Sequence, residues 1–248
     1  MALSLPDIAI LIAVFVLAGL VKGAIDLGLP TIAMGLLGAW FPPATAAAIL
    51  ILPALLTNVW QMASGPDLVA IVRRHFLMYL FAVLGTLLAV RIITHANTRV
   101  TTALLGLTLI SYAIVGLSGW RFVIRGKSEF WLGQVVGLVS GILNGATGVF
   151  VIPSAPYLQA VHRDKDEFVQ AIAASAFVFA VALGLGLGLN SAMDPATLVS
   201  GIVALFAAIG GMTVGQVLRA RLASAAFQNL VLAGLLALGV TMVVRGFL

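Results

Sequence analysis

Charged residues are scarce in this sequence: they make up 8% of its 248 positions, whereas 62% are hydrophobic. A soluble domain carries roughly 25% charged residues, so this supply cannot cover a water-exposed surface and most of the surface must face lipid. The mean hydropathy of +1.19 agrees. The formal net charge is +5, but the basic residues lie in short loops between apolar runs. There they set membrane orientation and do not indicate a nucleic-acid partner.

Cysteine is absent, which excludes disulfides, thiolate metal ligands and cysteine nucleophiles. Histidine is rare, and His75, His95 and His162 do not have the spacing of a metal site. All three lie at segment ends, where we expect solvated side chains at the membrane interface and no mutual cluster. We expect no cofactor. The stretch 1–20 lacks a basic region and an A-x-A cleavage site, so we expect a retained first helix.

Ten apolar runs follow one another along the chain. A hydrocarbon core of about 30 Å needs about 20 apolar residues in a helix, and the runs do not alternate as barrel strands do. Two of them are too short to cross comfortably and favour half-helices. We therefore predict an all-α polytopic membrane protein of 8–10 hydrophobic segments with broken or re-entrant helices. The runs cover approximately 6–22, 29–41, 44–63, 75–93, 99–118, 131–144, 149–161, 167–189, 196–217 and 226–247.

A short glycine motif occurs twice. Residues 19–23 read GLVKG and residues 137–141 read GLVSG, an offset of 118 positions. We interpret each motif as a glycine-rich break that opens one half of the chain, because each is followed by a short segment and three full ones. Five segments per half is an odd number, so the halves must enter the membrane from opposite sides. The pattern predicts two inverted repeats, 1–118 and 119–248, that together form one transmembrane domain.

Basic residues are biased to alternate loops, nine against three. Cytoplasmic loops of membrane proteins carry the excess of lysine and arginine, so the richer set predicts the cytoplasmic side of an inner membrane, with both termini periplasmic. The richer set is Arg73, Arg74, Arg121, Arg125, Lys127, Arg163, Lys165, Arg219 and Arg221. The opposite set is Arg91, Arg99 and Arg245.

Two stretches beside the glycine motifs carry a family resemblance. Residues 22–31 read KGAIDLGLPT, and residues 144–153 read NGATGVFVIP. With these stretches the chain resembles the sulfite exporter TauE/SafE family over essentially its whole length. The resemblance implies an integral-membrane carrier for sulfite, thiosulfate, organosulfonates or other small anions, so we expect a secondary transporter and not an enzyme. Asp26 departs from the small residue expected in the family's first break.

The two breaks predict one anion site. Glycines let a ligand approach the backbone, and Pro30 fits the first turn of a following half-helix. Such a half-helix points free amides and the positive end of its dipole at the ligand. The alternative is that the glycines only permit close helix packing. The predicted substrate-binding residues are Lys22, Gly23, Asp26, Gly28, Pro30, Asn58, Asn144, Gly145, Thr147 and Gly148.

Lys22 and Asp26 are four positions apart and would share a helix face. Ionised groups within a membrane are costly and usually functional, so Lys22 is a candidate counter-charge for the solute and Asp26 a candidate site for a coupling proton. The alternative is a mutually neutralising or interfacial pair. Asn58, together with Thr57 and Gln61, either lines the cavity or bonds neighbouring helices.

Rival functions stay open. An anion channel suits mirrored breaks equally well, and only saturation and counterflow would distinguish a carrier from it. An intramembrane enzyme is disfavoured, because Ser140 has no histidine in a comparable position and no HExxH motif occurs. A non-transporting scaffold would show no solute dependence. The expected partners are a small anion and the lipid bilayer, while coupling to a proton or sodium ion and a homodimer are left open.

Overall fold

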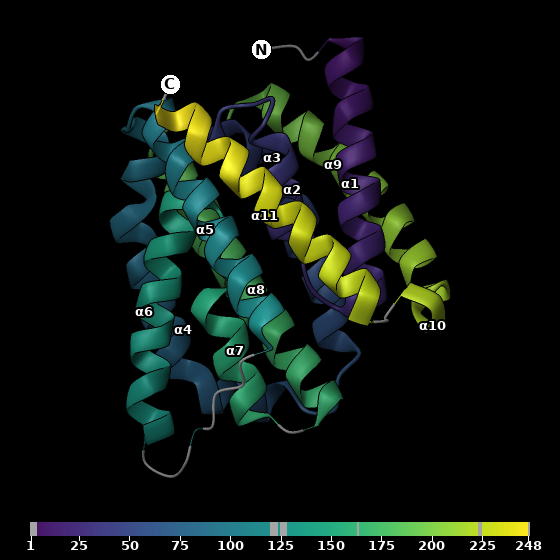
Figure 1. Cartoon of the computed structure of the whole chain (residues 1–248). Helices are drawn as coiled ribbons and strands as arrows, with labels where there is room; N and C mark the ends of the chain where they lie inside the picture. Colours follow the sequence, from purple (N-terminus) through teal and green to yellow (C-terminus); the bar gives the residue numbers. More distant parts are fainter. Residues whose placement is uncertain (1–3, 120–123, 125–127, 163, 223–224, 248) are drawn as a thin grey trace.

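Helices are the only regular secondary structure in the part of the chain that a computed structural model describes, which is residues 4–119, 124, 128–162, 164–222 and 225–247 (Figure 1). This confirms the predicted all-α class, and all ten predicted segments are found. The helices are α1 (Leu5–Ile25), α2 (Leu29–Leu37), α3 (Pro43–Ala63), α4 (Leu68–His95), α5 (Thr98–Ser118), α6 (Ser128–Thr147), α7 (Val151–Val161), α8 (Lys165–Leu189), α9 (Pro195–Val217), α10 (Arg219–Leu222) and α11 (Ala225–Phe247).

Eight of the described helices are long and apolar enough to cross a bilayer, namely α1, α3, α4, α5, α6, α8, α9 and α11. Helices α2 and α7 have 9 and 11 residues, and at 1.5 Å per residue they reach only about 14 and 17 Å. Large apolar side chains such as Leu88, Phe206 and Leu230 are exposed on the outer surface, where lipid would cover them. The protein is therefore a multi-pass membrane protein with two short internal helices.

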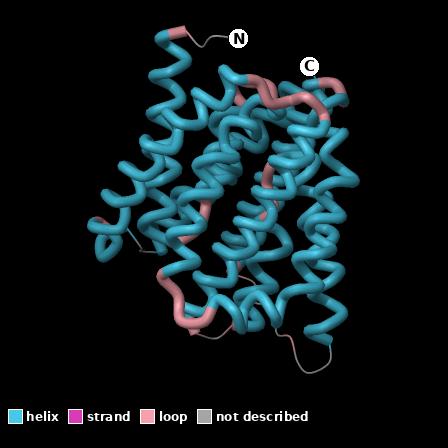
Figure 2. Tube along the Cα trace, turned by 180° about the vertical axis from the view of Figure 1, so that it is seen from behind, coloured by secondary structure: helices cyan, strands magenta, loops and turns pink. Residues whose placement is uncertain are grey.

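Packing between helices follows one pattern in both halves (Figures 1 and 2). Helix α1 packs along α9 and α6 packs along α4, while α3 contacts α8 and α9, and α8 contacts α3 and α4. Helices α5 and α11 pack against each other. Exchanging α1 with α6, α3 with α8, α4 with α9 and α5 with α11 reproduces the same contacts. Helix α1 runs away from the end that holds both termini, whereas α6 and α11 run toward it (Figure 1).

The GLVKG and GLVSG motifs lie inside helices, so the prediction that they are the breaks was wrong. A Cβ atom at Gly19 or Gly23 would overlap the backbone of α9, at the carbonyl oxygens of Ala208 and Met212. In the second half, Gly137, Gly141 and Gly145 meet the carbonyl oxygens of Met78, Ala82 and Thr86 on α4 in the same way. Small residues thus let the paired backbones touch.

The chain actually leaves helical geometry a few residues later in each half. Asp26 and Gly28 have φ values of 65° and 101° between α1 and α2, and Gly148 has a φ of 73° between α6 and α7. Glycine adopts this left-handed region without a steric penalty. Pro30 then occupies the second position of α2, where its missing amide hydrogen costs nothing. The prediction of a short helix after each break is confirmed.

Candidate functional site

The two breaks lie together in the interior. A small chamber is lined by 27–30 from the first break and by Phe150 and Val151 from the second. Lys22 on α1, Asn58 and Gln61 on α3, and three residues of α8 (Ile172, Ala173 and Ala176) complete its walls, together with Asp26. Its volume is about 20 Å³, which is room for about one water molecule. In this conformation the accessible space is smaller than an oxyanion needs.

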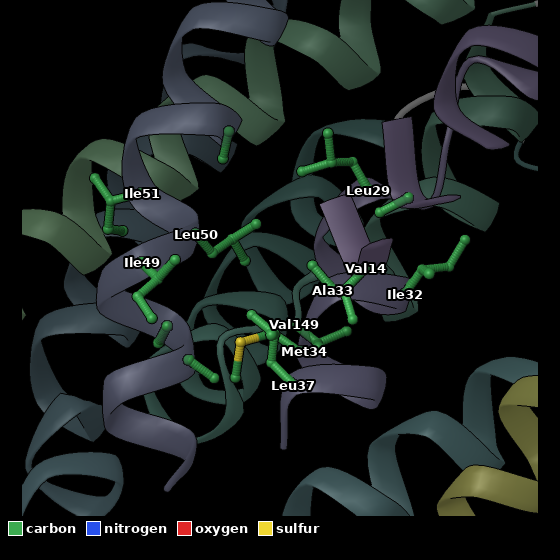
Figure 3. Close-up of a cluster of buried hydrophobic side chains, with 14 of the residues drawn as sticks. Val14, Leu29, Ile32, Ala33, Met34, Leu37, Ile49, Leu50, Ile51 and Val149 are labelled. Atoms are coloured by element: carbon green, nitrogen blue, oxygen red, sulfur yellow. The ribbon is translucent and has the colours of Figure 1, made fainter. Parts of the chain in front are cut away.

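Apolar side chains also join the two breaks. Figure 3 shows Met34 and Leu37 of α2 beside Val149 of the second break, with Leu29, Ile32 and Ala33 nearer the start of α2. A Cβ atom at Gly148 would approach the Met34 sulfur to 3.1 Å. Met34, Leu37 and Val149 are fully buried, so the tip of the second break rests directly on α2.

Lys22 is the buried cation of this site, with only 3% of its surface exposed. Its ammonium group donates to Thr57 Oγ1 over 3.2 Å and to Asn58 Oδ1. The Thr57 hydroxyl donates to the Pro53 carbonyl and the Asn58 amide donates to the Ala54 carbonyl, each over 2.7 Å. Because their hydrogens are committed to α3 itself, both side chains present acceptor oxygens to Lys22. An ammonium has three N–H bonds, so one is left without a partner among these contacts, and Lys22 lines the chamber.

Asp26 binds Arg219 and not Lys22, so the predicted Lys22–Asp26 pair is absent among the described contacts. The Asp26 carboxylate accepts from Arg219 Nη2, and Gln61 Nε2 lies 3.2 Å from the Asp26 carbonyl oxygen. Arg219 also donates to the Gly23 carbonyl from two nitrogens, over 3.3 and 3.1 Å. The cause is the left-handed backbone of Asp26, which ends α1 and removes the i, i+4 geometry of a continuous helix.

A larger cavity of about 340 Å³ opens next to this ion pair. Asp26 and Gln61 line both this vestibule and the chamber, whereas Arg219, Gln170 and Gln216 line the vestibule. The Asp26–Arg219 pair with Gln61 therefore lies between the two spaces. Helix α10, which carries Arg219, lies away from the end of the molecule that holds the termini (Figure 1).

The polar residues predicted from the second break bond within the protein. Asn144 Nδ2 donates to the Phe179 carbonyl over 3.0 Å and to Thr86 Oγ1 over 3.3 Å. Thr147 Oγ1 donates to the Leu143 carbonyl over 2.7 Å and accepts from the Val149 amide. In the described structure, none of the four predicted second-half residues, Asn144, Gly145, Thr147 and Gly148, lines the chamber.

The sequence model of the sulfite exporter TauE/SafE family matches residues 11–242. The chain belongs to this family. No curated protein and no solved structure matches it. The family match spans both breaks and every helix that lines the chamber, so the geometry above is that of a TauE/SafE membrane transporter.

Sequence reasoning missed several residues of the site in this TauE/SafE protein, namely Phe150, Val151 and Arg219, and the α8 residues Ile172, Ala173 and Ala176. Phe150 and Val151 line the chamber because they directly follow the break, as Leu29 and Pro30 do in the first half. Arg219 was read as an orientation charge in a loop, yet it binds Asp26. The position of Phe150 and Val151 relative to the break was a usable signal. Nothing local in the sequence pointed from Arg219 to Asp26, which lies 193 positions earlier.

The histidine prediction was wrong for two of the three side chains. His75 and His162 are 2% and 4% exposed, and their Nε2 atoms lie 2.8 Å apart. His95 is exposed, as expected, and bonds Thr94 Oγ1. Among the described residues no group of three or more His, Cys, Asp or Glu side chains could hold a metal ion. The basic residues Arg121, Arg125, Lys127 and Arg163 used for the orientation lie outside the described residues.

Proposed function

We propose that this protein is a secondary transporter of a small oxyanion such as sulfite, thiosulfate or an organosulfonate. It would work by alternating access built on two inverted halves, 1–118 and 119–248. The observation that carries the proposal is the buried ammonium of Lys22, which faces a chamber lined by both breaks and bonds only neutral partners in the described structure. Asp26 is close enough to interact electrostatically with Lys22, but its carboxylate is bound by Arg219. The three groups therefore leave one net positive charge, and an anionic solute would neutralise it.

Helix α2 adds to this positive field, because Leu29 and Pro30 begin it and both line the chamber. Val151 also lines the chamber, but Ile152 has non-helical φ and ψ values of −107° and 131°, so the regular part of α7 begins after it. A helix N-terminus carries about half a positive unit charge and free amide donors. Gly28 before α2 provides no side-chain cap, so backbone amides stay available to a solute.

The small chamber volume indicates that the conformation described here does not admit the solute. Entry of an oxyanion requires the space of about 20 Å³ to widen. The vestibule beside Arg219 is the nearest route, and parting of Asp26 from Arg219 would join the two spaces. The mirrored packing of the halves supports the same movement in reverse at the other end, which would give access from the opposite side.

Sidedness, partners and assembly belong to the same proposal. The excess of arginine and lysine near the start of α4 and in α10 favours a cytoplasmic vestibule and periplasmic termini in an inner membrane. The expected partners are the anion and the bilayer. We keep a homodimer and a coupling ion as predictions, and no enzymatic activity is expected of a TauE/SafE protein.

Transport is testable with the purified protein in liposomes. We expect saturable uptake and counterflow of radiolabelled sulfite, thiosulfate or methanesulfonate. Lys22→Gln should reduce that uptake, whereas Lys165→Gln, at an exposed lysine of α8, should not. Single-protein conductance without saturation would identify an anion channel instead. Absence of flux for every anion tested would overturn the proposal.

A further inference from the structure

A chain of titratable side chains links three helices at the vestibule end of α7, apart from the chamber. His75 lies on α4, His162 caps the C-terminus of α7, and Glu167 lies in the first turn of α8. His75 Nε2 is 2.8 Å from His162 Nε2, and His162 Nδ1 is 3.2 Å from Glu167 Oε2. The two rings are buried, whereas the Glu167 side chain is 49% exposed. The chain therefore runs from solvent to a buried ring.

The hydrogen bonds define which atoms carry protons. Ionised Glu167 can only accept, so His162 Nδ1 carries a hydrogen and its Nε2, in the neutral ring, accepts from His75 Nε2. One added proton fits without breaking a contact: His162 becomes cationic beside Glu167, and His75 carries its hydrogen on Nδ1, so that its Nε2 accepts from His162 Nε2. A second added proton would place two N–H donors face to face. The pair thus accepts one proton and is opened by the next.

Other charged and titratable groups surround the pair from every neighbouring helix. Arg74 on α4 forms an ion pair with Glu129 on α6 over 2.8 Å. The rings of Tyr79 on α4 and Tyr157 on α7 lie 6.2 and 6.1 Å from His75. Asp67 lines the small cavity that His162 and Glu167 share with Arg74. Arg74 is cationic, but its charge is matched by Glu129, which leaves Glu167 as the carboxylate that stabilises a proton on His162.

Two helices join this pair to the chamber. Helix α7 begins at Val151 in the chamber wall and ends beside His162, a reach of about 17 Å at 1.5 Å per residue. Helix α8 carries Glu167 in its first turn and Ile172, Ala173 and Ala176 in the chamber wall. The histidine pair therefore lies at the far end of two helices that also shape the anion site.

We infer that His75, His162 and Glu167 form a proton-binding relay that couples anion transport to proton movement. The inference rests on the proposed function and names its coupling ion. Histidine changes charge near neutral pH, and chains of acidic and histidine side chains within membranes serve as proton relays. The relay places the proton on the histidine pair and not on Asp26, whose carboxylate is held by Arg219.

The test uses a pH gradient as the only driving force. Native protein in liposomes receives equal thiosulfate or methanesulfonate on both sides, because these anions do not themselves titrate near neutral pH. The membrane potential is clamped with potassium and valinomycin. One pH unit then supports roughly a tenfold accumulation ratio for one proton per anion. Anion exchange at equal pH is measured in the same vesicles.

We expect His75→Gln, His162→Gln and Glu167→Gln to keep exchange but to bring the accumulation ratio close to one. His95→Gln changes an exposed histidine of the same helix as His75. This variant should show the same anion accumulation ratio as the native protein. Native-like accumulation in the His75 and His162 variants would overturn the inference. It would also be overturned if the native protein exchanges the anion but does not accumulate it under the pH gradient. Loss of exchange in all three variants would make the pair a structural contact only. Absence of exchange in the native protein would overturn the proposed function and this inference with it.

Discussion

Replacing Lys22 by glutamine removes the buried charge and keeps a hydrogen-bond donor near Thr57 and Asn58. Two of the three ammonium hydrogens are directed at those side chains, so one charge-assisted hydrogen bond to the solute is lost. Hydrogen bonds to charged groups contribute about 1.5–3 kcal/mol, and about 1.4 kcal/mol corresponds to a tenfold change in Kd. We therefore expect Lys22→Gln to raise the Kd for thiosulfate about ten- to hundredfold.

Isothermal titration calorimetry on the detergent-purified protein measures this Kd, with Lys165→Gln as the matched control at an exposed lysine. Thermal unfolding without ligand confirms that the variant is folded. Since Lys22 is buried, the ratio between variant and native Kd should persist when ionic strength rises from about 0.05 to 0.5 M, whereas a surface charge would be screened. A Kd within twofold of native would refute the role of Lys22 and leave the anion to the helix dipoles.

Three further outcomes are expected. Gly28→Leu should abolish thiosulfate uptake in liposomes without preventing membrane insertion, because Gly28 lines the chamber and has a φ of 101°. Gly119→Leu should retain uptake, because Gly119 has a φ of 63° but open space around it. In intact cells, an impermeant maleimide should not label the single cysteine of Arg221→Cys but should label that of Asn97→Cys. The reverse labelling pattern would show the opposite membrane orientation. Arg219→Gln should free the carboxylate that it binds, so the cysteine of Ala173→Cys in the chamber wall should react faster with a maleimide than it does when Arg219 is present. An unchanged reaction rate would remove this ion pair from the gate.

The helices and their order could be predicted from the sequence because each membrane-spanning helix satisfies its backbone hydrogen bonds within its own segment. The short helices were also visible, since glycine and Pro30 mark where α1 ends and α2 begins. Lys22 and Asn58 were placed in the site on the same local grounds, and both line the chamber. Their role in binding stays a prediction.

The site predictions that were wrong concern contacts between segments that lie far apart in the sequence. Gly23 and Gly145 were assigned to an anion site, but each lies against the backbone of another helix, and a glycine in a break looks the same in sequence as a glycine in a tight crossing. His75 and His162 are 87 positions apart, so their spacing carried no sign of a pair. Asp26 was predicted to pair with Lys22, the nearest cation along the helix, whereas in the folded protein it pairs with Arg219.

The glycine-lined crossing of α1 with α9 also fixes when the protein can complete its fold during synthesis. Gly19 lies against Ala208 and Gly23 against Met212, so about 190 residues must follow α1 out of the ribosome before its partner exists, which takes about 10–40 s at typical elongation rates. During that interval the bare glycine face of α1 stays uncovered in the bilayer. The crossing of α4 with α6 involves a much shorter stretch and can close first. The N-terminal helix is therefore among the first to enter the membrane and among the last to find its place.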